Sequence, residues 1–371
     1  MTKSGSFKRT VRRRAAEAGR TYTEELAITE AEEVNRRFSA EASWSSDGLP
    51  AHLQRTYGIE VTKLTQLSPH GAGVFRADRA DGPSWVARLF HDGGRLVESV
   101  LGDIEIMRHL EAHGFPAERV AHAEPLSRLA DHDVLVTLHA PGKAGAGAKQ
   151  AEALAEMLGR LHRLPRGTGR VLRDGGAFGH DKANEGKPKM DVRAAFCFLD
   201  SIAHRIAPEG GPVLEALRAE LEGTDTGEGL PEALTTLNVT DRDVIVGKDG
   251  SFTFVDWKPA GQGPRIVSLA WLLYGATQRG HPMYPHPERI DLDLVRRTVR
   301  GYAREITPMA EELNRLDAII RLHQLYMAAW YYWQSALAGV TPTGREGFMP
   351  RHDLTDIVAE AAVAEFNAVA G

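Results

Sequence analysis

The stretch TTLNVTDRDVIVGKDGSFTFVDW, residues 235–257, has the clearest local structure in this chain of 371 residues. Two runs of β-branched and aromatic residues, DVIVGKDG and SFTFVDW, meet at a Lys-Asp-Gly turn. Such runs favour strands and the turn residues favour a tight reversal of the chain. The stretch therefore predicts a β-hairpin that follows a polar loop and ends on an acid, Asp256.

Upstream of this hairpin, residues 58–142 have the pattern of strands around one helix. The runs GIEVTKLTQL, SWVARLF and VLVTLHAPG predict strands, since their residues fit a half-buried pleated surface. Residues 95–114 have leucine, isoleucine and methionine at helical spacing and end at Gly114. This pattern predicts one amphipathic helix closed by a glycine.

Downstream of residue 142 the pattern becomes mainly helical. The run QAEALAEMLGRLHRLP places Leu154, Met157, Leu158 and Leu161 on one helical face, and helical spacing returns after residue 264. Residues 1–50 are almost entirely good helix formers. We therefore divide the chain into a helical N-terminal extension (1–50), a strand-rich lobe (51–142) and a mainly helical lobe with the hairpin (143–371).

Composition limits the partners of the protein. A net charge of −5 gives no general attraction to nucleic acid. The single cysteine, Cys197, cannot form an intrachain disulfide and fits a reducing cytoplasm. No apolar run reaches the about 20 residues that a membrane span needs. We therefore expect a cytoplasmic protein with no nucleic-acid or membrane partner.

The N-terminal extension begins with a basic cluster, KRTVRRR, and becomes acidic further on. A solvated helix face is the simpler interpretation of such charges. Contact between this extension and a protein partner is the alternative.

Three segments in a fixed order carry a resemblance to a known family. VLVTLHAPG, LAEMLGRLHRLP and FVDWKPAGQGP are similar to the hinge, the following helix and the metal-binding segment of the aminoglycoside phosphotransferase and choline kinase-like family. The resemblance covers about residues 60–335. It implies an α+β, two-lobed protein kinase-like fold with ATP, or another nucleoside triphosphate, and Mg2+ as cofactors. The implied acceptor is a hydroxyl of a small molecule or of a peptide serine or threonine.

The catalytic loop departs from the pattern of that family. Where the family has HGDLHPGN, this chain has TLNVTDRD, residues 236–243. Asn238 stands at the position of the catalytic acid, and an amide cannot accept a proton at neutral pH. Asp241 is the alternative base. Asp243 replaces the metal-binding Asn and, with Asp256, supplies the two oxygen ligands that a phosphate-bound Mg2+ needs.

The strand-rich lobe departs as well. Arg88 stands where the resemblance implies a lysine on the phosphates, and Glu105, with Asp103 behind it, is the acid expected to pair with it. In the loop SPHGAGVF, Gly71 and Gly73 would allow close approach of the backbone to phosphates. In the hinge, Thr137 and His139 are the candidate contacts of the nucleotide.

A third departure lies after the hairpin, where Ser268 replaces an Asp of the family and predicts weaker support of the catalytic loop. Two functions of different class therefore remain. One is an ATP- and magnesium-dependent phosphotransferase, in which Arg88 takes part in catalysis with Asn238 or Asp241. The other is a pseudokinase that serves as a nucleotide-binding or scaffold subunit.

Overall fold

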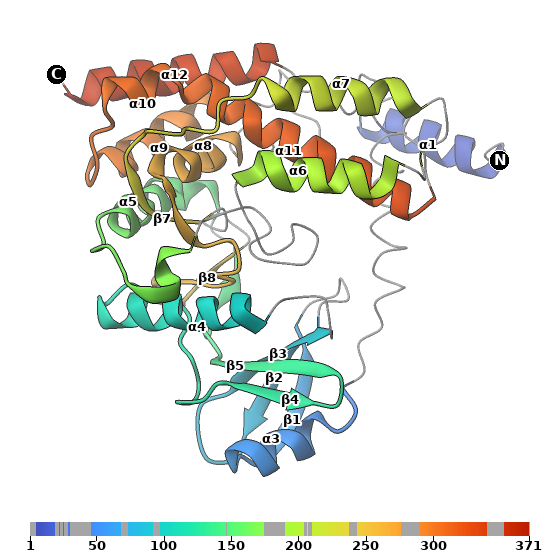
Figure 1. The fold of residues 1–371 in the computed structure, drawn as a ribbon, viewed down its shortest axis with the longest axis vertical. Helices are drawn as coiled ribbons and strands as arrows, with labels where there is room; N and C mark the ends of the chain where they lie inside the picture. Colours follow the sequence, from blue (N-terminus) through green and yellow to red (C-terminus); the bar gives the residue numbers. More distant parts are fainter. Residues whose placement is uncertain are drawn as a thin grey trace.

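The computed structural model describes most of the chain outside the N-terminal extension and several loops. The described residues are 5–18, 22, 25, 29, 46–67, 73–91, 97–145, 147–173, 190–203, 206, 210–236, 243–275, 290–339 and 352–370. Two lobes are visible in Figure 1, a sheet-rich one below and a helical one above.

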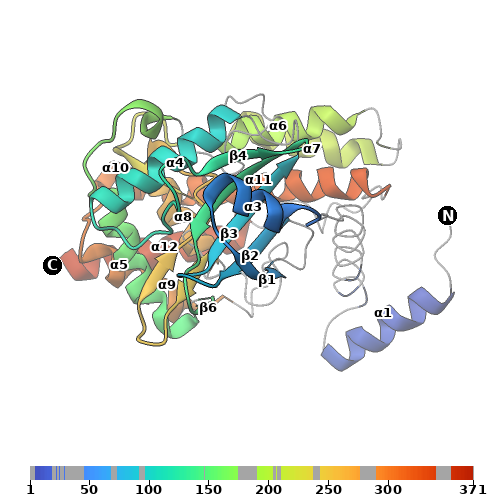
Figure 2. The same cartoon turned by 90° about the horizontal axis from the view of Figure 1, so that it is seen from below.

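The small lobe is built on one antiparallel sheet with the strand order β1-β2-β3-β5-β4. Helix α3 covers one face of this sheet and helix α4 lies on the other (Figures 1 and 2). The bounds are α3 (Leu49–Tyr57), β1 (Val61–Gln66), β2 (Gly73–Arg79), β3 (Trp85–His91), α4 (Val97–Ala112), β4 (Leu126–Leu129) and β5 (His132–Leu138).

The alternation of side chains along β3 decides what each face of the sheet carries. Ala87 and Leu89 are buried in the core that the sheet shares with α3. Arg88 therefore points to the opposite face, toward α4, and lies opposite Leu135 of β5. Leu135 belongs to the larger core that α4 shares with the helical lobe. The alternation along β3 thus places the guanidinium of Arg88 on the face of the sheet that packs against α4 and the large lobe.

The large lobe is mainly helical, as predicted, with two small sheets next to the small lobe. Its helices are α5 (Ala151–His162), α6 (Met190–Ile202), α7 (Gly211–Glu222), α8 (Arg265–Gly275), α9 (Leu292–Ala303), α10 (Ala310–Asn314), α11 (Leu316–Leu337) and α12 (His352–Ala370), with the 3-10 turns η1 (Ala148–Gln150) and η2 (Gly169–Leu172). Its strands are β6 (Lys143–Ala144), β7 (Glu232–Thr235), β8 (Val244–Val246), β9 (Phe252–Phe254) and β10 (Gly261–Pro264).

The predicted hairpin is confirmed. Strands β8 and β9 pair antiparallel, with Val244 opposite Phe254, and Gly250 in the connecting turn has a φ of 83°. Strand β6 extends this hairpin into a three-stranded sheet. The pairing of β7 with β10 was not predicted, because strand β10, Gly-Gln-Gly-Pro, has none of the residues that mark a strand.

The N-terminal extension contains helix α1 (Gly5–Ala18), in agreement with its composition. Val11 and Ala15 of this helix are buried, and Arg14 forms an ion pair with Glu25 at 2.8 Å. Among the described residues, no helix is long and apolar enough to cross a membrane.

Helices α5 and α9 approach each other most closely at Gly301. A Cβ atom at this position would lie 1.9 Å from the carbonyl oxygen of Glu152, which is backbone and cannot rotate away. We therefore expect Gly301→Ala to lower the free energy of unfolding by about 1–3 kcal/mol, as overpacking does.

Urea denaturation of Gly301→Ala and of Gly211→Ala would check this expectation. Gly211 lies in the first turn of α7, and nothing lies within 4 Å of a Cβ added there. The control should be neutral or slightly stabilising, since alanine favours helices. Equal midpoints for the two variants would show that the α5–α9 contact can open without cost.

Candidate active site

The hairpin brings two predicted metal ligands to neighbouring positions. Asp243 precedes β8 and Asp256 follows β9, so antiparallel pairing places both at the same end of the hairpin. The amide of Val255 donates a hydrogen bond to the carbonyl oxygen of Asp243 at 2.9 Å. Two carboxylate residues with adjacent backbones are a suitable donor set for a hard cation.

Asp256 adopts a backbone conformation that few side chains tolerate. Its φ is 62°, in the left-handed region, where aspartate and asparagine are several-fold enriched over other non-glycine residues. The next residue, Trp257, is buried and packs edge-to-face on Phe115, with ring centroids 6.0 Å apart. The surrounding structure therefore holds Asp256 in a strained turn, as is common at functional sites.

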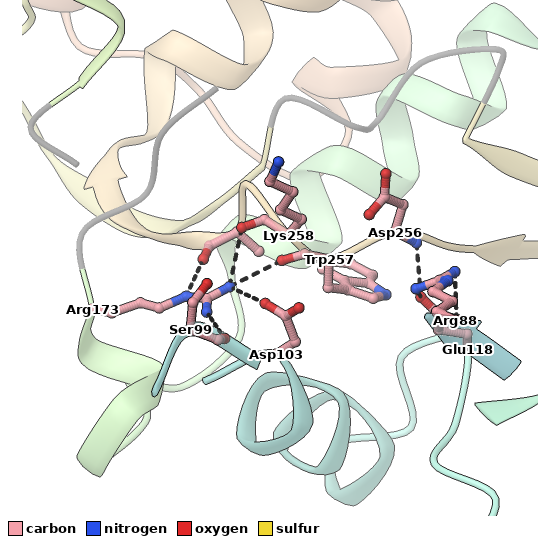
Figure 3. A network of polar contacts seen from close by, with 9 residues as sticks. Arg88, Ser99, Asp103, Glu118, Arg173, Asp256, Trp257 and Lys258 are labelled. Atoms are coloured by element: carbon pink, nitrogen blue, oxygen red, sulfur yellow. Dashed lines mark hydrogen bonds and ion pairs between the residues drawn. The ribbon is translucent and has the colours of Figure 1, made fainter. Parts of the chain in front are cut away.

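One carboxylate of the small lobe supports this turn. The amide of Asp256 donates to Oε1 of Glu118 at 2.7 Å, and Glu118 is almost fully buried. The same carboxylate accepts two hydrogen bonds from the guanidinium of Arg88, at 3.0 Å to Oε1 and 2.9 Å to Oε2 (Figure 3). Glu118 thus links the guanidinium of Arg88 on β3 to the backbone of the predicted metal-binding segment.

The electrostatic setting of Arg88 follows from this arrangement. Burial opposes its charged form, but nearby Glu118, Asp256 and Asp103 favour that form, so the pKa of Arg88 is raised overall. Arg88 therefore lies within electrostatic reach of Asp256, as expected for a cation at a phosphate site.

The expected pairing of Arg88 with an acid of the helix is wrong. Glu105 accepts hydrogen bonds from the backbone amide and the guanidinium of Arg170, at 2.9 and 2.7 Å. Asp103 binds Arg173 at 2.7 Å. Both acids of α4 face the 165–173 segment of the large lobe, which leaves Glu118 as the partner of Arg88.

The hinge offers backbone groups more readily than side chains. Thr137 is fully buried and its hydroxyl has no hydrogen-bond partner within the described part of the chain. The amides of Leu138 and His139 donate to the carbonyl oxygens of Arg119 and Ser84. Ala140 carries the next amide, and among the described residues no acceptor binds it. The backbone amide of Ala140 is therefore a further candidate donor to the base of a nucleotide, beside the side chains named from the sequence.

The imidazole of His139 is partly buried in the same hinge. Burial and the neighbouring Arg76 lower its pKa, with Asp78 acting in the opposite direction. His139 is therefore neutral at neutral pH and does not add positive charge to the hinge.

Three of the predicted site residues lie outside the described residues: Asn238, Asp241 and Gly71. Gly73 is the first residue of β2, opposite Leu89, so it belongs to the strand and not to the loop before it. At the entrance to the catalytic loop, the buried amide of Thr236 donates to the hydroxyl of Ser268 at 3.1 Å. Ser268 therefore contacts this loop entrance, and the weaker support of the catalytic loop stays a prediction because residues 237–242 lie outside the described residues.

The donor set fits magnesium held jointly by protein and phosphate. Among the described residues, no group of three or more histidine, cysteine, aspartate or glutamate side chains converges as a metal site. Asp243 and Asp256 alone would not enclose an ion. Mg2+ commonly takes one or two protein carboxylates and completes its shell with phosphate oxygens and water.

A two-lobed fold with a cation on β3 and two acids on one hairpin matches the arrangement that the resemblance to kinase-like phosphotransferases predicts. A family model described as "Phosphotransferase enzyme family" matches residues 69–311. The chain belongs to this phosphotransferase family. A comparison with curated protein sequences found no significant match.

Solved structures of the same fold agree. Amicoumacin kinase hAmiN, in complex with AMP-PNP, Ca2+ and Ami, is 14% identical with a TM-score of 0.60, covering 89% of this chain and 95% of that chain. Aminoglycoside-3'-phosphotransferase of type VIII is 21% identical with a TM-score of 0.51, covering 76% and 98%. A thermostable mutant of APH(4)-Ia, with AMP-PNP and hygromycin B, is 14% identical with a TM-score of 0.52, covering 87% and 99%. These likenesses confirm the predicted protein kinase-like fold.

Glu118 is the site residue that the sequence analysis missed. It lies 30 residues beyond Arg88 in sequence, in the segment between α4 and β4. The available signal was an acid within a largely apolar run, FPAERVA, where Phe115 and Ala117 are also buried. A charged residue among buried neighbours is unusual unless it is paired.

We expect Glu118→Gln to lower the free energy of unfolding by about 3 kcal/mol. The amide oxygen of glutamine can still accept from Asp256, but the buried guanidinium of Arg88 loses its counter-charge, and breaking such a pair is costly. Urea denaturation would measure the change.

Glu98→Gln is the matched control, because Glu98 is 73% exposed and pairs with Arg170 at the surface. It should change stability by less than about 1 kcal/mol. A loss at Glu118 as small as the loss at Glu98 would contradict a structural role for the buried pair.

Proposed function

We propose that this protein is a nucleoside triphosphate- and magnesium-dependent kinase that transfers a phosphoryl group to a hydroxyl of a small molecule. One observation carries the proposal. The hairpin sets Asp243 and Asp256 side by side, and Glu118 connects the turn at Asp256 directly to Arg88. Phosphoryl transfer requires mainly positioning and charge stabilisation, which such an arrangement supplies.

The nucleotide would occupy the space between the lobes. A hinge amide at Ala140 suits an acceptor nitrogen of a base, and the amicoumacin kinase and APH(4)-Ia complexes with AMP-PNP support a nucleotide in this fold. Arg88 would contact the phosphates. A guanidinium has five N–H donors, and Glu118 uses two of its nitrogens, so donors remain for phosphate oxygens.

Asp243 and Asp256 would hold the metal. Bound magnesium would neutralise charge on the phosphates during transfer. An aspartate at position 243 keeps an oxygen ligand where relatives have an amide and adds a negative charge, which strengthens attraction for a divalent cation. The left-handed turn at Asp256 fixes the direction of its side chain.

The acceptor hydroxyl would lose its proton to a group of the catalytic loop. Asn238 cannot take a proton, so it would orient the hydroxyl by hydrogen bonding, and Asp241 would act as the base. The acceptors named with similar structures, Ami and hygromycin B, support a small molecule over a peptide.

The pseudokinase alternative rests on a separate observation. Both ends of the guanidinium of Arg88 bind Glu118, and the position of the usual base carries an amide at Asn238. A protein with these two features would bind nucleotide, and would support a partner enzyme, without transferring phosphate.

Magnesium–ATP should stabilise the protein. At a ligand concentration 100-fold above the Kd, binding adds about 2.7 kcal/mol to the free energy of unfolding. Thermal melting with ATP, with and without magnesium, measures the shift. Asp256→Asn should remove the magnesium-dependent part, because it loses a charged ligand while asparagine tolerates the left-handed φ.

The exposed acid Asp81 provides the control, and Asp81→Asn should keep the full shift of the wild type. Absence of any shift in the wild-type protein at millimolar magnesium–ATP would refute both the kinase and the nucleotide-binding pseudokinase.

Reversion of the catalytic loop should separate the two functions. If transfer is limited by the missing base, Asn238→Asp should raise turnover, up to the about 10²–10⁴ that a positioned base contributes. The measurement is nucleotide consumption with a panel of alcohols, for the full chain and for a chain without residues 1–50.

Wild-type turnover that falls on Asp241→Asn and is unchanged on Asn238→Asp would assign the base to Asp241. No turnover in any form, despite magnesium–ATP binding, is the result expected of the pseudokinase and would rule out the kinase.

A further inference from the structure

A second buried arginine, Arg173, lies on the other side of the metal-binding segment. It follows η2 in the large lobe, and its side chain is 8% exposed. In Figure 3 its guanidinium lies between α4 and the loop that contains Trp257 and Lys258. Every side-chain nitrogen of Arg173 donates to an acceptor of one or the other element.

The contacts to α4 are both short. Nη2 donates to Oδ1 of Asp103 and Nη1 donates to the carbonyl oxygen of Ser99, each at 2.7 Å. Gly102 makes this approach possible, because a Cβ there would lie 2.5 Å from Nη1 of Arg173. The helix thus has a gap in its side-chain surface where the guanidinium lies.

The contacts to the metal-binding segment are all to its backbone. Nε donates to the carbonyl oxygen of Ala260 at 2.8 Å, and Nη2 donates to those of Trp257 and Lys258 at 3.1 and 3.3 Å. The carbonyl oxygen of Arg173 itself accepts from the amide of Gln262 at 2.6 Å. One residue therefore binds four positions of the segment directly after Asp256.

We propose that Arg173 is a positioning residue of the phosphotransfer site, which fixes the segment carrying Asp256 to helix α4. The proposal rests on the proposed function in taking Asp256 as a metal ligand. A planar guanidinium is suited to this task, since it can serve acceptors on two elements at once in a fixed geometry.

The two charged pairs act on the segment from opposite sides. The carboxylate of Glu118 holds the amide of Asp256, and the guanidinium of Arg173 holds the carbonyl groups that follow. In this left-handed turn, the carboxylate of Glu118 therefore accepts from the backbone amide, and the guanidinium of Arg173 donates to the backbone carbonyl groups. Loss of Arg173 would remove the contacts that hold the carbonyl groups of this turn to α4.

Arg170 provides a natural comparison on the same 3-10 turn. It pairs with Glu98 and Glu105 of α4, but its side chain is 43% exposed. Its side-chain donors reach α4 and, among the described residues, no part of the metal-binding segment. Replacing Arg170 would therefore remove contacts to α4 and leave the contacts of Arg173 with the metal-binding segment in place.

The first experiment is amide hydrogen exchange on the full-length protein. Arg173→Met should raise exchange at least about tenfold in residues 255–262 and in α4 together, since charged hydrogen bonds to both are lost. Arg170→Met should leave residues 255–262 unchanged. Gly102→Ala displaces the guanidinium without removing it, and should reproduce the pattern of Arg173→Met if that variant fails to fold.

The second experiment separates positioning from general support of the fold. The Kd for ATP is measured with and without magnesium in each variant. Arg173→Met and Gly102→Ala should reduce the gain from magnesium by about tenfold or more, while the metal-free Kd stays within about twofold. Arg170→Met should keep both values.

Uniformly faster exchange, a response in only one of the two segments, or an equal loss of affinity with and without magnesium would overturn the positioning role. If the wild-type protein binds no nucleotide, the proposed kinase fails. The exchange pattern then decides the role of Arg173 by itself: a coupled response supports the link to α4, and its absence refutes it.

Discussion

The site depends on one carboxylate that serves two lobes. Glu118 binds the guanidinium of Arg88 and the backbone amide of Asp256 at the same time. A buried anion needs compensation from several donors, and these two elements supply them. Because Glu118 is nearly inaccessible to water, neither contact can be replaced by solvent. The distance between the guanidinium of Arg88 and the turn at Asp256 is therefore set by the reach of a single side chain.

Four largely buried charges at the lobe boundary form two ion pairs. Arg88 forms an ion pair with Glu118, and Asp103 of α4 forms one with Arg173. An interchange of partners would require four buried charges to move together. Such pairs contribute little net stability compared with apolar packing, yet losing one member is costly. The two pairs therefore fix the positions of the charged groups more than they stabilise the fold. Substitutions at these four positions should have strongly non-additive effects on the free energy of unfolding.

Local patterns were sufficient for most of the fold. The hairpin and helix α5 both follow from spacing within a few residues, which periodicity reports well. The partner of Arg88 did not follow, because the pair joins positions 30 residues apart, while Asp103 and Glu105 lie nearer in sequence. Strands β7 and β10 were missed for a related reason, since each has four residues and pairs with a strand more than 25 residues away in sequence. The adjacency of Asp243 and Asp256 follows from the hairpin, and their role as metal ligands stays a prediction. The loop containing Asn238 and Asp241 lies outside the described residues.

The hydrophobic cores do not follow the division of the chain into lobes. The sheet and α3 share one apolar cluster, whereas Ile104, Met107 and Leu110 of α4 belong to the cluster of the large lobe. Helix α4 therefore lies between strands of the small lobe in sequence, but its apolar side chains pack in the hydrophobic core of the large lobe. A fragment ending at residue 142 would expose the apolar face of α4 to water, and the large lobe alone would lack part of its core. The lobes are consequently not exchangeable modules, and recombination with a relative would have to transfer α4 together with the helical half.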